Sequence, residues 1–424
     1  MKLLHTSDWH LGRITYNTSR AEDHTKVIGE ILDLARQEKP DLVVHTGDLF
    51  ESVRPAYEDM ERATQALLAL GEVAPVVVLC GNHDSPALFK VFGELLGPNS
   101  RVRFVDRARP PDQGGVVTFG SQKGETIRLA MLPFVHANRM VPAFEKPDTW
   151  MVQYADRIQV IEEALWEGLK ESANFSTDVL LFAAHLHVSG ATFSRSERSI
   201  HITDTYASRI EHVPKVSYAA FGHIHKPQAL PQSEKGWYAG SPIPLDFGEM
   251  GEEKVTIMVE ATPGRPPTIR PIPLSGGRPL KKIAGTLDDI RQMAPSVGNA
   301  LCLVSVMTDT PVSNLSERVR EILPAATLLN VEEVCSARKV SALKREDIQG
   351  VEPTFEELFR DYLAQTGTKG SSIDKVVSTF GALLSAVEHE EQLDLAEEHL
   401  ADNLTGADVG VTPPALSSGK EGAA

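Results

Sequence analysis

Histidine, aspartate and asparagine residues gather at five short and widely separated places in this sequence. These clusters are Ser7-Asp8-Trp9-His10, Gly47-Asp48, Gly81-Asn82-His83-Asp84, His185-Leu186-His187 and Gly222-His223-Ile224-His225. Their donors include no thiolate, so the set suits Mn, Fe, Zn or Mg rather than an iron–sulfur cluster or a structural zinc knot. Seven candidate ligands are too many for one tetrahedral ion. They agree with two ions that share a carboxylate, an arrangement that binds a phosphoryl group and activates water.

Each cluster follows a short apolar run that predicts a buried strand. The runs are Leu3–Leu4, Leu42–Val44, Val76–Leu79, Val179–Ala183 and Tyr218–Phe221. Apolar residues recur at helical spacing between the first three runs, at Val27, Ile28, Ile31, Leu34 and Ala35 and at Met60, Ala63, Leu67 and Leu70. Alternating strands and helices predict a layered α/β sheet. Ligand sites in such sheets lie at the carboxyl ends of the strands, so these polar side chains should converge.

Composition limits the classes of protein that the chain can represent. The 424 residues are 42% hydrophobic and 24% charged, with a net charge of −16, which excludes a fibrous protein and argues against a general nucleic-acid coat or a binder of anionic membranes. The three cysteines form no CxxC motif, and no run approaches the ~18 apolar residues that a membrane span needs. These features predict a cytoplasmic protein without a membrane segment.

The chain divides by composition into several regions. Residues 263–279 are rich in proline and glycine and suit a linker. A second, small α/β unit is predicted beyond it, from helices at Leu287–Met293 and Ser313–Leu323 and strands at Ala300–Met307 and Ala326–Val331. Phe355, Leu358, Phe359, Tyr362 and Leu363 then predict an amphipathic helix. The predicted boundaries are 1–275, 276–346 and 347–400, followed by a disordered tail at 401–424.

The order of the motifs resembles the calcineurin-like metallophosphoesterases. Longer strings resemble the bacterial SbcD family of nuclease subunits; they are His5-Thr-Ser-Asp-Trp-His-Leu-Gly12, Gly47-Asp-Leu-Phe50, Gly81-Asn-His-Asp-Ser85, His185-Leu-His-Val-Ser-Gly190 and Gly222-His-Ile-His-Lys226. The resemblance implies a layered sheet sandwich with helices outside, a small capping domain and a C-terminal helical segment that binds an SbcC-type ATPase. It also implies a homodimer and a Mn-dependent DNA exonuclease and endonuclease, active on hairpins, in DNA repair, recombination and replication.

The same resemblance assigns roles to individual residues. Two trios of ligands would each hold one ion: Asp8, His10 and His225, and Asn82, His185 and His223. Asp48 would bridge the ions, and His83 would contact the scissile phosphate or protonate the leaving oxygen. His187 stays open as a ligand in place of His185, because both would share one face of the strand. Glu51 stands where more distant repair nucleases carry a second active-site histidine.

Several residues outside the clusters allow two interpretations. Trp9 is expected in the core, and four further histidines are expected in the core or on the surface: His24, His136, His201 and His212. Two sets of residues either contact the DNA backbone or belong to an ordinary solvated surface. The first set is Arg13, Tyr16 and Arg20, and the second is Arg101, Arg103, Arg107 and Arg109. The helix from Phe355 either packs on its own domain or docks a partner.

Two other functions compete with a nuclease. A phosphodiesterase acting on nucleotides or other small phosphodiesters would use the same core motifs, but the string Trp9-His-Leu-Gly12 and the length of the chain disfavour it. A scaffold without catalysis would be expected to have lost ligands, whereas this sequence retains every ligand type together with His83.

Overall fold

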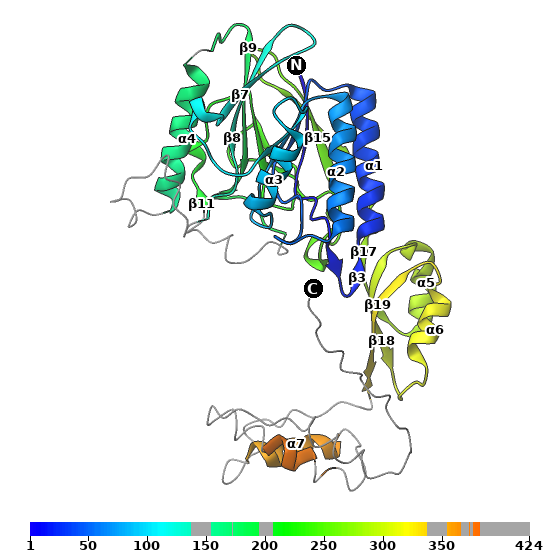
Figure 1. The fold of residues 1–424 in the computed structure, drawn as a ribbon. Helices are drawn as coiled ribbons and strands as arrows, with labels where there is room; N and C mark the ends of the chain where they lie inside the picture. Colours follow the sequence, from blue (N-terminus) through cyan, green and yellow to red (C-terminus); the bar gives the residue numbers. More distant parts are fainter. Residues whose placement is uncertain are drawn as a thin grey trace, which may run out of the picture. The chain divides into compact units, whose positions relative to one another are not determined.

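The computed structural model describes most of the chain (Figure 1). The described residues are 1–136, 154–171, 173–194, 207–336, 354–365, 373 and 376–381. They fall into two units, the first comprising Met1–Met307 with Val312–Glu333 and the second comprising Thr308–Pro311 with the described residues from Val334 onward. The predicted tail at 401–424 and His201 lie outside the described residues.

One six-stranded sheet carries the first three clusters. Its order is β16-β15-β1-β4-β5-β6. The parallel strands are β1 (Lys2–Thr6), β4 (Leu42–His45), β5 (Val76–Leu79) and β6 (Val102–Val105). The antiparallel strands are β15 (Val255–Glu260) and β16 (Thr268–Pro273). The helices α1 (Ala21–Glu38), α2 (Tyr57–Val73) and α3 (Pro86–Leu96) connect the parallel strands.

A second six-stranded sheet carries the other two clusters. Its order is β13-β14-β12-β9-β8-β7. The strands are β7 (Val116–Gly120), β8 (Thr126–Leu132), β9 (Asp178–His185), β12 (Tyr218–Gly222), β13 (Gln228–Ala229) and β14 (Gly236–Tyr238). The helix α4 (Tyr154–Lys170) covers this sheet, and the short strands β10 (His187–Val188) and β11 (Ala207–Ser208) pair beside it.

The two sheets pack face to face, and successive side chains of each strand point alternately into the core between the sheets and into the core under the helices. Leu3 and Val44 face the apolar core shared with Leu181 and Met131 of the second sheet, whereas Leu4 faces the outer core under α1 and α2. Side chains of a strand alternate between the two faces of its sheet, so both faces of this sheet are covered. The layers therefore form a sandwich with helices outside. The predicted fold is confirmed, and the five predicted strands lie within β1, β4, β5, β9 and β12.

The predicted linker is partly wrong, because Thr268–Pro273 forms the edge strand β16. Pro271 and Pro273 lie opposite Ile257 and Val255 in the ladder. An edge strand tolerates proline because one side of its backbone has no ladder partner.

The small α/β region that the sequence predicted beyond residue 279 contains three strands and two helices among the described residues. They are β17 (Leu280–Gly285), β18 (Leu301–Thr308), β19 (Thr327–Cys335), α5 (Leu287–Val297) and α6 (Leu315–Ile322). Ile283, Ile290, Val304 and Val319 belong to its apolar core. The four predicted elements are present, but β17 was not predicted, because Lys281 and Lys282 interrupt its apolar pattern.

In the second unit, α7 (Phe355–Gln365) confirms the predicted helix. The ring of Phe359 stacks on Phe380 with a centroid distance of 4.3 Å. Among the described helices, none combines the length and the apolar character that a membrane span requires.

Candidate metal centre

The five polar clusters meet at one end of the sandwich, beyond the carboxyl ends of strands from both sheets. The Asp8 amide donates to the Gly47 carbonyl at 2.9 Å, and the His10 amide donates to the Asp48 carbonyl at 3.0 Å. Across the second sheet, Gly222 lies opposite His185 in the ladder. The loops after β1 and β4 and the strands β9 and β12 are therefore held in fixed register around one point.

Glycine is required at two positions because ligand side chains pass close to the backbone. Gly47 has a φ of +105°, and a Cβ atom there would lie 2.2 Å from Nδ1 of His185. A Cβ atom on Gly81 would lie 2.1 Å from Oδ1 of Asp48. Any side chain at either position would displace a predicted ligand.

Four predicted ligands form the first group. Asp8, His10, Asp48 and His225 are buried, and each offers a ligand atom within 4.8 Å of the other three. The Nε2 atoms of His10 and His225 lie 3.1 Å apart. Nitrogen and carboxylate donors that converge in this way suit a divalent cation of borderline hardness.

Three predicted ligands form the second group. Oδ1 of Asn82 lies 2.9 Å from Nε2 of His185 and 2.8 Å from Nδ1 of His223. Oδ2 of Asp48 lies 3.4 Å from Nε2 of His185 and 3.7 Å from Nε2 of His10. Asp48 thus lies between the two groups, in the place of the predicted bridge.

The electrostatics of the centre favour positive charge. Burial lowers the pKa of His185, but the nearby carboxylate of Asp48 raises it to about 9. Burial raises the pKa of Asp48, but the charges of His185 and His83 hold it well below its usual range. The buried, ionised carboxylate of Asp48 thus attracts positive charge, which a divalent cation supplies as well as a protonated imidazole does.

His83 lies beside the first group without belonging to it. Its backbone amide donates to Oδ1 of Asp48 at 2.8 Å, and its Nδ1 lies 2.9 Å from the carbonyl oxygen of Glu51. Its ring meets the ring of His10 edge-on, with centroids 4.7 Å apart. These contacts fix the ring through Nδ1 and direct Nε2 away from the Glu51 loop.

Two glutamates contact the far nitrogens of the first group. Oε2 of Glu51 lies 2.9 Å from Nδ1 of His10, and Oε1 of Glu249 lies 3.1 Å from Nδ1 of His225. Burial raises the pKa of Glu51, but the His10 hydrogen bond and the charge of Arg13 lower it to about 2. Burial raises the pKa of Glu249, but Lys254 and His225 hold it below its usual range.

Sequence reasoning missed three contributors to the centre. Glu249 lies in a 3-10 turn outside every motif, so no local signal marked it. Phe134 stacks on His223 with ring centroids 5.8 Å apart. Asp84 was visible in the string Gly81-Asn-His-Asp, and it accepts backbone bonds from Leu49, Phe50 and Gly81 that join two ligand loops.

His185 and His187, between which the sequence left the choice of ligand open, have different neighbours. His185 contacts Asn82 and Asp48, whereas the ring of His187 packs against Phe193 with centroids 4.8 Å apart. Trp9 is fully buried, which confirms its predicted place in the core.

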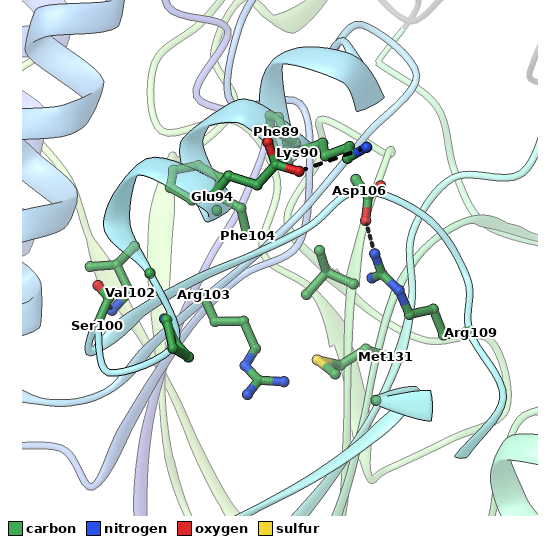
Figure 2. Close-up of a pocket in the computed structure, with 15 residues that line it drawn as sticks. Phe89, Lys90, Glu94, Ser100, Val102, Arg103, Phe104, Asp106, Arg109 and Met131 are labelled. Atoms are coloured by element: carbon green, nitrogen blue, oxygen red, sulfur yellow. Dashed lines mark hydrogen bonds and ion pairs between the residues drawn. The ribbon is translucent and has the colours of Figure 1, made fainter. Parts of the chain in front are cut away.

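Most of the arginines that were candidates for DNA contacts instead contact other residues of the protein. Arg20 is buried and paired with Asp23, and Arg101 donates to carbonyls at the end of α2. Arg107 and Arg109 both pair with Asp106. Arg103 makes no hydrogen bond or ion pair with the described residues, and it lines a cavity of about 460 Å³ on the side of β6 where Met131 lies (Figure 2).

Residues 1–227 match the family model of the calcineurin-like phosphoesterases. The chain belongs to the calcineurin-like phosphoesterase family. As a member of this family it is a metal-dependent phosphodiester hydrolase, and two relatives confirm the resemblance to the SbcD branch. Residues 277–367 match a second model, the Type 5 capsule protein repressor C-terminal domain.

The relatives of this phosphoesterase include two bacterial proteins that are each named as the SbcD component of the nuclease SbcCD. The protein from Bacillus subtilis is 30% identical over 288 residues, which cover 66% of this chain and 72% of the relative. The protein from Escherichia coli K12 is 24% identical over 417 residues, which cover 92% of this chain and 100% of the relative. Among solved structures, a dimetal phosphatase from Danio rerio aligns with a TM-score of 0.41 and 13% identity over 64% of this chain and 95% of that one.

Proposed function

We propose that this chain is the nuclease subunit of an SbcCD-type complex. It hydrolyses DNA phosphodiester bonds as an exonuclease and as an endonuclease that opens hairpins, in DNA repair, recombination and replication. The observation that carries this proposal is the position of Asp48 between two groups of buried donors, with His83 beside it. This arrangement supports an in-line displacement at phosphorus.

The ligand roles follow the two groups. Asp8, His10 and His225 would hold one divalent ion, a second trio of Asn82, His185 and His223 would hold the other, and Asp48, which lies between the two groups, would serve both. The bound ions supply Lewis acidity and lower the pKa of a coordinated water. Four imidazoles, two carboxylates and one amide fit manganese, and the family resemblance favours this metal over the others that the donors allow.

The other residues of the centre act on the substrate. His83 protonates the leaving oxygen or contacts the scissile phosphate, because its Nδ1 is engaged by the Glu51 carbonyl and its near-neutral ordinary pKa suits proton transfer. Arg103 contacts the DNA backbone, since a guanidinium with no protein partner among the described residues attracts phosphate. Arg103 would thus supply a local positive charge on a chain whose net charge is −16.

The domains of the chain have different roles in this proposal. Residues 1–275 form the catalytic domain, residues 276–346 the capping domain and residues 347–400 the segment that binds an SbcC-type ATPase. The names of the two bacterial relatives support assembly in a complex. The amphipathic helix α7 supplies the apolar face that a partner helix would cover.

A homodimer of the nuclease subunit is proposed to form through α2 and α3. Leu68, Val91 and Leu95 are 44%, 46% and 78% exposed on these two helices. Leu68 and Leu95 line a mostly apolar groove of about 200 Å³. Adjacent exposed apolar side chains on two helices are typical of a surface between subunits.

The proposed compartment is the cytoplasm. Cys302 and Cys335 are buried and form no disulfide with the described residues. Thiols in this state are typical of a reducing compartment.

The decisive experiment combines hairpin-ended DNA with the purified chain and Mn²⁺, with and without chelator and the ATPase partner. The proposal predicts hairpin opening and exonucleolytic shortening that need Mn²⁺ and increase with partner and ATP. Hydrolysis of bis-p-nitrophenyl phosphate without any cleavage of DNA would instead favour a small-molecule phosphodiesterase. The absence of both reactions with metal bound would favour a scaffold.

A further inference from the structure

We propose that a pocket of about 250 Å³ beside the metal centre binds an unpaired nucleotide of the DNA substrate, with the base on its apolar walls and a phosphate at Arg54. The pocket lies between three segments. They are the loop after β1, the hairpin of β2 (Ile14–Thr15) and β3 (Thr18–Ser19), and the loop that leads from Glu51 into α2. The inference rests on the proposed function, because it concerns the DNA that the metal centre cleaves.

The pocket adjoins the metal centre directly. Its floor residue Leu11 follows the ligand His10, and the Leu11 carbonyl accepts from the Glu51 amide at 3.0 Å. The carboxylate of Glu51 lies 2.9 Å from Nδ1 of His10, and its carbonyl oxygen lies 2.9 Å from Nδ1 of His83. Glu51 thus lines the pocket and also contacts one ligand and the proposed proton donor. A nucleotide in the pocket is therefore a close neighbour of the nucleotide whose phosphate is cleaved.

The walls of the pocket are apolar and held in place. Ile14, which is 60% exposed, stands on one side, and Pro55 and Ala56 stand on the other. The hairpin that carries Ile14 is anchored, because the Thr15 hydroxyl donates to the Leu245 carbonyl at 3.1 Å. Exposed apolar side chains on a fixed frame favour contact with the flat face of a base, because that contact removes both surfaces from water.

The uncompensated charge of the lining is positive. Two acidic residues line the pocket, and each is paired: Glu51 accepts from Arg13 at 2.8 Å, and Asp59 accepts from Arg62 at 2.7 Å. The side chain of Arg54 is exposed, and it makes no hydrogen bond or ion pair with the described residues. A guanidinium in this state binds phosphate through charge-assisted hydrogen bonds.

Apolar walls beside a free cation select for a nucleotide whose base is accessible. A base inside a duplex keeps its faces in the stack and cannot reach the walls, and unpairing it costs free energy. This cost is smallest for a nucleotide that is already unpaired. The pocket therefore favours DNA with a frayed end or a hairpin loop next to the scissile bond.

The experiment is a fluorescence titration of the full-length chain in EDTA, where no cleavage occurs. The two probes are duplexes with 2-aminopurine at one terminus, either unpaired or paired with thymine. Wild type should bind the unpaired probe about 5- to 100-fold more tightly, which is the range that contact with one base supplies. R54A should abolish this preference by removing the phosphate contact, and A56W should abolish it by filling the pocket.

Two matched variants should keep the preference of wild type. R265A removes an exposed arginine from the turn after β15, at the opposite end of the first sheet from the metal centre. A56S keeps the pocket open, and serine is a favoured residue at this position, the N-cap of α2. Thermal melting checks that each variant folds, and R54A gives the answer if A56W does not.

Equal affinity of wild type for the two probes, or an undiminished preference in folded R54A, would overturn the inference. Cleavage of fully paired DNA by wild type with Mn²⁺ is measured separately. Its absence would count against the proposed function, whereas either result in EDTA leaves that cleavage intact.

Discussion

The Nε2 atoms of His10 and His225 lie 3.1 Å apart, although 215 positions separate the two residues in the chain. Two imidazole nitrogens at this distance share a proton or a cation between them, because facing lone pairs repel. His10 follows β1 in the first sheet and His225 follows β12 in the second. The sandwich of the two sheets is thus what creates the candidate centre.

Replacement of His83 by glutamine should separate metal binding from catalysis. The ring contacts Glu51 and His10 but lies outside both ligand groups, so H83Q should retain both ions and lose at least about 100-fold in cleavage rate. Metal analysis and a DNA cleavage assay measure the two effects. The matched control H212Q, on the short turn Ile210–His212, should cleave at the wild-type rate. Normal cleavage by H83Q would show that the assigned role is wrong.

Replacement of Arg103 tests the proposed backbone contact. R103A should weaken binding to DNA of any sequence and reduce the slope of log affinity against log salt by about one phosphate contact. Fluorescence anisotropy at several salt concentrations measures the slope. R36A is the control, since Arg36 is exposed on α1 and paired with Asp33. An identical slope for R103A and wild type would exclude Arg103 from the DNA path.

Deletion of residue 351 onward tests the partner segment. The truncated chain should no longer capture an SbcC-type ATPase in a pull-down, because α7 is removed. Mn-dependent hydrolysis of bis-p-nitrophenyl phosphate should remain, because the metal centre lies in residues 1–275. Undiminished capture of the ATPase would refute docking through this segment.

Glu162 should make stability depend on pH. Burial raises the pKa of this α4 carboxyl from 4.5 to about 8, although the Ser208 hydroxyl donates to it. Below pH 4.5 both states hold the proton and the stabilising contribution is complete. As the pH rises toward 8 only the unfolded state releases it, so the free energy of unfolding falls by about 1.4 kcal/mol per pH unit.

E162Q should remove this slope in urea unfolding followed between pH 5 and 8 in EDTA. E167Q is the matched control, because Glu167 is exposed on the same helix and is not among the groups that shift the pKa of Glu162, so its replacement should leave the slope unchanged. Parallel pH profiles for wild type and E162Q would mean that Glu162 is ionised in the folded protein.

The sequence was sufficient to predict the strands and their polar ends because both signals are local. The run Val76–Leu79 followed by Gly81-Asn82 indicates a buried strand and a ligand loop within a few residues. The choice between His185 and His187 required the position of Asn82, 103 residues from His185. Glu249 carried no local signal, since its role depends on contact with His225 across a turn. The strand β17 was missed because its lysines hide an apolar alternation that only the neighbouring strand reveals.

Glu51 shows a different limit. From the sequence it was only the residue in place of a histidine that more distant nucleases carry. Its side chain contacts both Nδ1 of His10 and Arg13, which are 41 and 38 positions away. The place of Glu51 beside the Gly-Asp-Leu-Phe string therefore did not indicate its contacts with His10 and Arg13, because these contacts depend on long-range packing.

Anomalous diffraction from crystals grown with Mn²⁺ tests the central claim most directly. The account predicts two manganese peaks, one bounded by Asp8, His10 and His225 and the other by Asn82, His185 and His223, with Asp48 in contact with both. A single peak, or peaks that do not touch Asp48, would contradict it.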